Sequence, residues 1–268
     1  MLETIDWHRP WLAPFLPVVE AASAGGDWRA VFNALSNAKA IHNHAGLPLR
    51  FVDQGALPPD VPYETFISET GGVPTRPNLH DFFNAMVWLS YPHAKAQLNA
   101  LQASEITRRF ASISVTGSGK AERATRGTLR DRATIFDENA ALLLTCEPTV
   151  ALALRAHHWQ ESLLQHRADF GTTCEVMLFG HALIEKLVTP YKAITAHVWV
   201  LQVATDFFDL PVGDKQAAVD SILGKRLADG LLKEAPTPLP VLGVPGWWEG
   251  QDAHFYADTA VFRPKRPS

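Results

Sequence analysis

The hydrophobic pattern of the chain centres on residues 79–89, a run that is apolar on nearly every side when it is drawn as a helix. Asn78 stands directly before the run, at the position of an N-cap. His80 and Asn84 lie on one side of this helix, with Asp81 beside them. A helix that is apolar all round is usually buried, so its few polar groups need partners inside the protein. We therefore expect this helix to form one wall of the functional site.

Helical spacing of apolar residues predicts several further helices along the chain. They cover residues 28–35, 63–70, 94–105, 148–166, 174–188 and 213–232. Residues 49–52 predict a short strand, and residues 195–208 are apolar in a way that fits either a strand or a helix. The pattern therefore predicts a mainly α protein with a few short strands, and an α+β arrangement stays open.

The domain organisation is predicted from the absence of breaks in this pattern. No internal repeat and no clear linker interrupts the chain, which favours a single compact domain over residues 1–233. Residues 234–268 are rich in proline and contain Trp247 and Trp248. We expect this segment to be an extended C-terminal arm that its aromatic residues hold on the same domain.

Composition limits the class of the protein. The chain has 268 residues, 47% of them hydrophobic and 19% charged, which is enough apolar material for a core. The formal net charge of −4 argues against general binding to nucleic acids or anionic membranes. The two cysteines lack metal-site spacing, no run approaches eighteen consecutive apolar residues, and the N-terminus lacks a signal-peptide core. We therefore expect a cytoplasmic protein with no membrane segment.

One stretch departs from the acidic balance. Residues 108–132 contain seven basic side chains against two acidic ones. The stretch could bind an anionic small molecule or a nucleic acid, and the plainer alternative, above all for residues 120–132, is a solvated loop. Its middle, residues 116–120, is predicted to be mobile. It is no phosphate-binding P-loop, because that motif requires Gly at 114 and Ser or Thr at 121, where this chain has Ser114 and Ala121.

Several phrases of the sequence resemble the bacterial domain-of-unknown-function family 3025. They are residues 73–76, 79–84, 134–139, 179–187, 190–192 and 245–248. The resemblance runs from about residue 40 to the end of the chain. It implies one domain and a bacterial, cytoplasmic origin, and it implies no activity, so function has to be inferred from the residues.

The first candidate site is the adjacent pair His80 and Asp81. A histidine followed by an aspartate on a helix supplies two metal ligands, as in helical phosphohydrolases of the HD type. Such a site also needs an upstream histidine, for which His42 or His44 is available, and a downstream aspartate, for which Asp137 is available. The alternative is structural, because Asp81 stands third in its helix, where a carboxylate closes a capping box.

The second candidate is His181 with Glu185, one helical turn apart. Residues at i and i+4 share a face, so the two side chains can hold one ion or bond to each other. They lie at the edge of the apolar face, where a histidine of the core margin would also lie.

The third candidate is Asp137 with Glu138, which could supply a metal ligand or a general base. Asp137 could equally cap a helix.

These candidates lead to one principal hypothesis, a metal-dependent hydrolase that acts on a phosphate-containing substrate. In this hypothesis a divalent metal ion is held by His80, Asp81, His181 and Glu185. Asp137 or Glu138 is a ligand or base, and Arg76 and Lys186 neutralise the charge of the substrate. The alternative is a non-catalytic module that binds nucleic acid or protein and whose polar residues form a structural hydrogen-bond network. A third interpretation is an enzyme without metal in which His181 and Glu185 are an acid–base pair.

Overall fold

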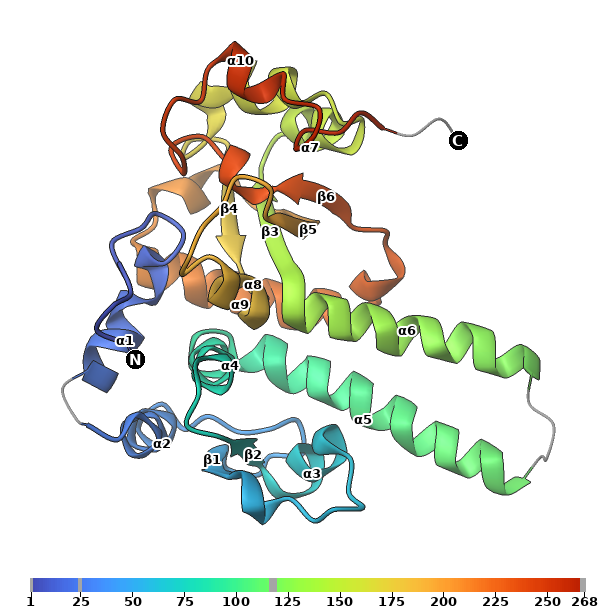
Figure 1. The fold of residues 1–268 in the computed structure, drawn as a ribbon. Helices are drawn as coiled ribbons and strands as arrows, with labels where there is room; N and C mark the ends of the chain where they lie inside the picture. The colour runs from blue at the N-terminus through green and yellow to red at the C-terminus, as the bar shows by residue number, and fades with distance from the viewer. Residues whose placement is uncertain (1, 24–25, 116–119, 266–268) are drawn as a thin grey trace.

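The fold is a mainly helical α+β arrangement built around a small mixed sheet (Figure 1). The computed structural model describes residues 2–23, 26–115 and 120–265, and of residues 23, 109–115 and 120–128 it describes the backbone alone. The helices are α1 (Leu16–Ser23), α2 (Trp28–Ala38), α3 (Tyr63–Thr70), α4 (Leu79–Ser90), α5 (Pro92–Val115), α6 (Lys120–Asn139), α7 (Pro148–Arg155), α8 (His181–Lys186), α9 (Val212–Ala228) and α10 (Ala253–Tyr256). The strands are β1 (Arg50–Asp53), β2 (Gly72–Thr75), β3 (Ala140–Thr145), β4 (Cys174–Leu178), β5 (Thr195–Gln202) and β6 (Thr237–Pro240). No helix of this described part is long and apolar enough to cross a membrane.

The main sheet has the strand order β4-β3-β5-β6. Strand β3 runs parallel to β5 and antiparallel to β4, and β6 pairs antiparallel with β5. All six residues of β3 are buried, because the strand has a neighbour on each side and is covered on both faces. Strand β6 comes from the segment 234–268, so this C-terminal segment takes part in the main sheet.

A second, two-stranded parallel sheet joins β1 to β2 and leads into α4. Helix α3 links the two strands, and Gly71 ends it with a left-handed φ of 70°. The predicted strand at 49–52 and the predicted helix after residue 63 are confirmed.

Helix α4 is the buried helix that its sequence predicts. Every residue from Asp81 to Ser90 is buried, and the Asn78 side chain accepts a hydrogen bond from the Asp81 amide at 2.8 Å. In Figure 1 this helix lies between the layer of β1 and β2 and the layer of the main sheet. It therefore places its first residues, His80 among them, at the boundary between the two layers.

The basic stretch 108–132 is mostly helical. Helices α5 and α6 lie side by side, and residues 120–132 belong to α6 and form no loop (Figure 1). Of the predicted mobile loop, residues 116–119 lie outside the described part of the chain. The helix arises because residues 120–139 contain neither proline nor a run of β-branched residues.

The helix predicted at 174–188 is wrong in its first half, which is strand β4; only residues 181–186 are helical. The apolar run at 174–178 fits the periodicity of a helix and that of a strand, and pairing with β3 makes it a strand. The helix predicted at 148–166 ends at Arg155 and is followed by a separate π-helical turn at 161–165. Residues 195–202, left open by the sequence, are strand β5.

Candidate metal centre

Three chain segments meet at the boundary between the two layers: the start of α4, the end of α6 and the start of α8. The end of α6 and the start of α8 are fixed to each other through the backbone, since the Gly180 amide donates to the Ala140 carbonyl at 2.9 Å. A Cβ atom at Gly180 would lie 2.5 Å from the amide nitrogens of Asn139 and Ala140, so only glycine permits this approach. As a result Glu138, two residues before Ala140, comes close to His181.

His181 is the most deeply placed residue of the centre, with 3% of its surface exposed. Its Nδ1 lies 2.9 Å from the main-chain oxygen of Asp137. A carbonyl oxygen only accepts hydrogen bonds, so Nδ1 carries the proton and Nε2 of the neutral ring presents a lone pair. Burial lowers the pKa of His181 to about 4, which keeps the ring neutral at pH 7.

His80 is held in the same manner from the opposite side. Its Nδ1 lies 3.0 Å from Oε2 of Glu185, and a carboxylate is also an acceptor. The other nitrogen of His80, Nε2, lies 3.2 Å from Nε2 of His181. The second nitrogen of each ring therefore points at the other ring.

This geometry suits a positive charge between the rings. When both Nδ1 atoms donate, two neutral rings would place lone pairs against each other at 3.2 Å, which is repulsive. The repulsion disappears if a metal ion binds both Nε2 atoms, or if one ring carries an extra proton and donates it to the other. Metal–nitrogen bonds of about 2.0–2.1 Å set two ligand nitrogens of a tetrahedral ion roughly 3.4 Å apart, close to the spacing found.

Glu138 completes a cluster of three potential ligands. Its Oε2 lies 3.6 Å from Nε2 of His181, and the ligand atoms of His80, Glu138 and His181 all lie within 4.8 Å of one another. Burial, followed by the charge of Asp137, raises the pKa of Glu138, and the charges of His80 and Lys186 act in the opposite sense. The side chains of Glu138 and His80 are 40% and 37% exposed, so solvent reaches one side of the cluster.

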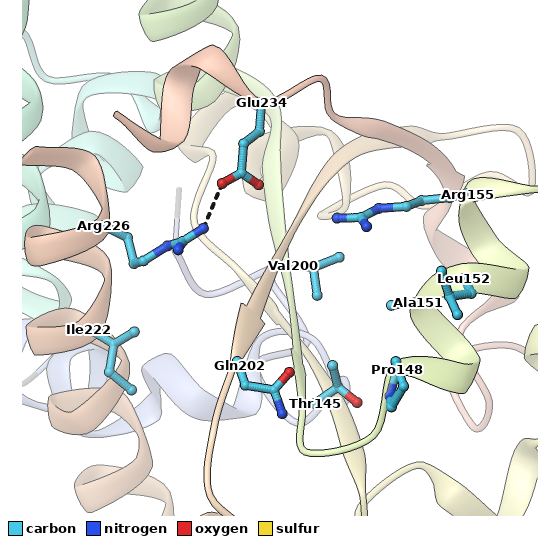
Figure 2. Close-up of a pocket in the computed structure, with 10 residues that line it drawn as sticks. All are labelled: Thr145, Pro148, Ala151, Leu152, Arg155, Val200, Gln202, Ile222, Arg226 and Glu234. Carbon is cyan, nitrogen blue, oxygen red and sulfur yellow. Dashed lines mark hydrogen bonds and ion pairs between the residues drawn. The ribbon is translucent and has the colours of Figure 1, made fainter. Parts of the chain in front are cut away.

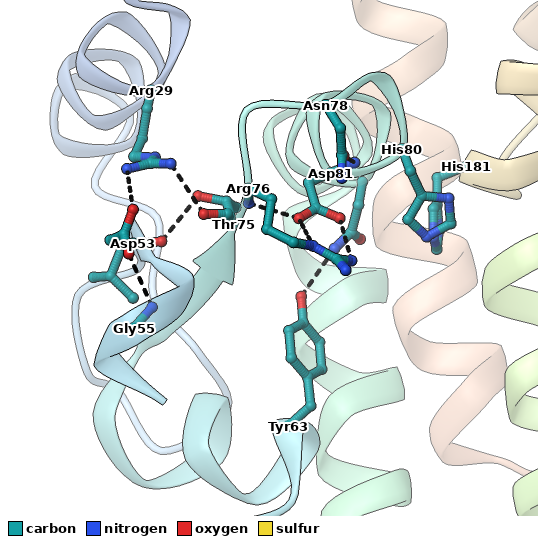
Figure 3. Close-up of polar contacts among 12 residues, drawn as sticks. Arg29, Asp53, Gly55, Tyr63, Thr75, Arg76, Asn78, His80, Asp81 and His181 are labelled. Atoms are coloured by element: carbon teal, nitrogen blue, oxygen red, sulfur yellow. Dashed lines mark hydrogen bonds and ion pairs between the residues drawn. The ribbon is translucent and has the colours of Figure 1, made fainter. Parts of the chain in front are cut away.

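The predicted ligand Asp81 is turned away from this cluster. Its carboxylate accepts from the Arg76 amide at 2.6 Å, from Arg76 Nε at 3.0 Å and from Nη2 at 3.2 Å. Figure 3 shows this fork beside His80 and His181, whose ring planes stand at 68° to each other. Asp81 is thus a buried anchor for Arg76, and it does not return to the cap residue as a capping box would require.

The other predicted residues lie around the cluster in distinct places. Glu185, on the same helix as His181, reaches across to His80. The Asp137 side chain pairs with Lys95 at 2.5 Å and has its Oδ2 4.0 Å from Nδ1 of His181, while its main-chain oxygen holds the same nitrogen. Lys186 is exposed, near enough for its charge to lower the pKa of Glu138.

A buried polar chain that the sequence did not predict lies behind the centre. Lys95 is 4% exposed and donates to Asp137 and, at 2.9 Å, to Asn84 Oδ1. Asn84 in turn donates to the Tyr63 hydroxyl at 3.0 Å. Burial opposes the charge of Asp137, but Lys95, followed by His181, keeps the pKa of this carboxyl below its usual value. A lysine between Ala94 and Ala96 on a helix with an apolar face was the available signal.

The upstream histidines considered for the site lie elsewhere. His42 and His44 line a separate surface pocket of about 530 Å³ together with residues of α5 and α9. That pocket includes His93, whose Nδ1 lies 2.7 Å from Asp220. His42 and His44 are therefore suitable controls for experiments on the centre.

The comparisons with known proteins address the family of the chain. No curated protein and no solved structure matches the chain. The family model described as "Protein of unknown function (DUF3025)" matches residues 49–266. This span contains the start of α4, the end of α6 and the whole of α8, and it covers most of the 268 residues. The chain belongs to the DUF3025 family.

Proposed function

We propose that this protein is a metal-dependent hydrolase whose divalent ion is bound by His80, Glu138 and His181. The observation that carries the proposal is the pair of Nε2 atoms facing each other at 3.2 Å while each Nδ1 is committed to an acceptor. Two histidines and one carboxylate are a donor set used by hydrolytic zinc sites, which keep a further position for water. A bound water of this kind has a pKa near neutrality and can act as a nucleophile.

The surroundings of the three ligands support the assignment. Glu185 behind His80 and the Asp137 carbonyl behind His181 are acceptors that orient metal-binding imidazoles and raise their basicity. His181 is neutral at pH 7, as a ligand has to be. Its burial also places the ion against a wall that excludes water from one side.

Two exposed basic residues support the proposed substrate class. Lys186 lies near Glu138, and Arg76 is fixed by Asp81 with 57% of its side chain exposed. Both suit a phosphate-containing substrate, because Arg forks and Lys ammonium groups bind phosphate oxygens. In this proposal Asp81 positions Arg76, and Glu185 positions His80.

The test is the metal content and phosphoesterase activity of the wild type and of two variants. After loading with zinc or manganese and desalting, elemental analysis should find near-stoichiometric metal in the wild type. His181→Ala and His80→Gln should lose it, and a phosphoester substrate panel should show hydrolysis that disappears with metal removal. His42→Ala is the matched control, because His42 lines a different pocket. His80 is partly exposed, so its variant should fold normally.

Equal metal content in the wild type and in both variants would overturn the proposal. Metal binding without any hydrolysis would support the metal site and contradict the proposed hydrolase activity. That second result would favour a non-catalytic binding module, an alternative supported by the buried chain from Lys95 through Asn84 to Tyr63. Absence of metal together with a titrating His80–His181 pair would instead favour acid–base chemistry.

A further inference from the structure

A second pocket, unrelated to the metal centre, opens between α7 and α9 and measures about 280 Å³ (Figure 2). Its floor includes Thr145 and Gln202, the last residues of β3 and β5. These strands are parallel neighbours, and Thr145 pairs with Gln202 in their register. The carboxyl ends of parallel strands are where open α/β sheets form ligand crevices.

The pocket exists because β6 is shorter than β5. Strand β6 pairs with β5 only from Thr195 to Val198, so the last residues of β5 have no β6 residue beside them. Val200 is consequently half-buried in a strand whose other apolar residues are nearly all buried. Together with Ile222 of α9 and Leu152 of α7, it gives the pocket an apolar lining. Leu152 is 59% exposed, which is high for a large apolar residue.

Two guanidinium groups flank this apolar lining. Arg226 donates to Glu234 at 2.6 Å, so this pair neutralises itself. Arg155 extends over the pocket from the opposite side (Figure 2), and no described residue pairs with its guanidinium. The pocket therefore has a net charge of +1 and one free fork of donors. A guanidinium fork matches a planar carboxylate.

We propose that this pocket binds a small amphipathic carboxylate, with its carboxylate on Arg155 and its apolar body on Val200, Leu152 and Ile222. The volume lies just below the range of about 300–1,000 Å³ that is typical of pockets for drug-sized molecules, so the ligand is a small carboxylic acid. The two sites are distinct: β3 separates them, and its six residues span about 17 Å. Ligand binding here does not depend on the metal centre.

The experiment measures the binding of octanoate to the full chain by titration calorimetry and by amide shifts in nuclear magnetic resonance. Octanol serves as the uncharged probe of equal length, and acetate as the probe that has the charge alone. Arg155→Gln removes the fork at an exposed position. Arg50→Gln is the matched control, an exposed arginine on β1 with no side-chain partner in the described part of the chain.

The expected result is saturable octanoate binding with shifts at the amides of Thr145, Ala151 and Gln202. Octanol and acetate should bind at least tenfold more weakly, and Arg155→Gln should weaken octanoate at least tenfold while Arg50→Gln leaves it unchanged. The His80→Gln protein should bind octanoate like the wild type. Equal binding to Arg155→Gln, equal binding of octanol or acetate, or no saturable binding would each overturn the proposal.

Discussion

The two imidazole rings of the metal centre are held by acceptors of different strength. His80 faces the carboxylate of Glu185, whereas His181 faces a neutral carbonyl. A carboxylate partner strengthens an imidazole as a metal ligand, so His80 should be the stronger ligand of the two. The chemistry of the centre is thus decided by the atoms behind the rings as much as by the rings.

Glu64 is the residue whose protonation should be easiest to follow. Its carboxylate accepts from Asn99 at 2.7 Å, and burial, followed by the charge of Asp137, raises its pKa from 4.5 to about 7. The folded protein therefore holds a proton between pH 4.5 and pH 7 that the unfolded chain has released. The stability that this proton contributes is complete below pH 4.5 and is lost as the pH rises through 7.

Glu64→Gln should remove this loss. The free energy of unfolding of the variant minus that of the wild type should grow by up to about 3 kcal/mol between pH 4.5 and pH 7. Urea unfolding at a series of pH values measures the difference. Glu69→Gln, at an exposed position of the same helix, is the control and should follow the wild type. A difference that shrinks with rising pH would contradict the raised pKa of Glu64.

Single residues show where sequence was sufficient and where it was not. Asn78 caps its helix as predicted, because a cap depends on residues within one turn. The separation of Asp81 from the cluster and the reach of Glu185 to His80 depend on contacts over long stretches of chain, which periodicity does not encode. Glu138 could be named from sequence only as one of several acidic candidates.

At the scale of elements, the centre depends on the close approach of two backbone segments. The end of α6 and the start of α8 are in contact at Gly180, whose amide donates a hydrogen bond to the carbonyl of Ala140. Helix α8 has only six residues, so its position is set by β4 before it and by this contact. The helix predicted at 174–188 covers both β4 and α8, so the turn between them that fixes His181 was not predicted.

Gly180→Ala should consequently disturb the centre without changing any ligand. The added methyl group would overlap the backbone at Asn139 and Ala140, which should cost about 1–3 kcal/mol of stability and displace His181. Thermal unfolding and metal titration measure the two effects. Gly213→Ala, where a methyl group meets nothing within 4 Å, is the control and should raise stability by about 0.4–1 kcal/mol. Equal behaviour of the two variants would refute a close approach at Gly180.

At the scale of the whole molecule, the segment 234–268 is bound to the body through the sheet as well as through aromatic contacts. Strand β6 covers part of the outer edge of β5, and Leu239, Val241 and Leu242 are fully buried. Trp247 packs against Trp11, with ring centroids 5.8 Å apart. The single-domain prediction therefore extends naturally to this segment.

A chain that ends at Lys233 should fail to fold cooperatively. The truncation uncovers the edge of β5 and removes several fully buried side chains, a loss that exceeds the stability of an ordinary domain. Loss of the thermal transition, together with aggregation in light scattering, is the expected result. A chain that ends at Lys265 is the control. A soluble, cooperatively unfolding 1–233 fragment would show that residues 234–268 are dispensable for the fold.

The contact between His80 and His181 joins residues that are 101 positions apart in the chain. An ion shared by the two rings would thus act as a removable cross-link between the two layers of the molecule. For a loop of about 100 residues, a covalent cross-link is worth about 4.7 kcal/mol in the chain-entropy description. Metal supply would then set the resistance of the protein to proteolysis, and starvation for metal would mark the protein for degradation.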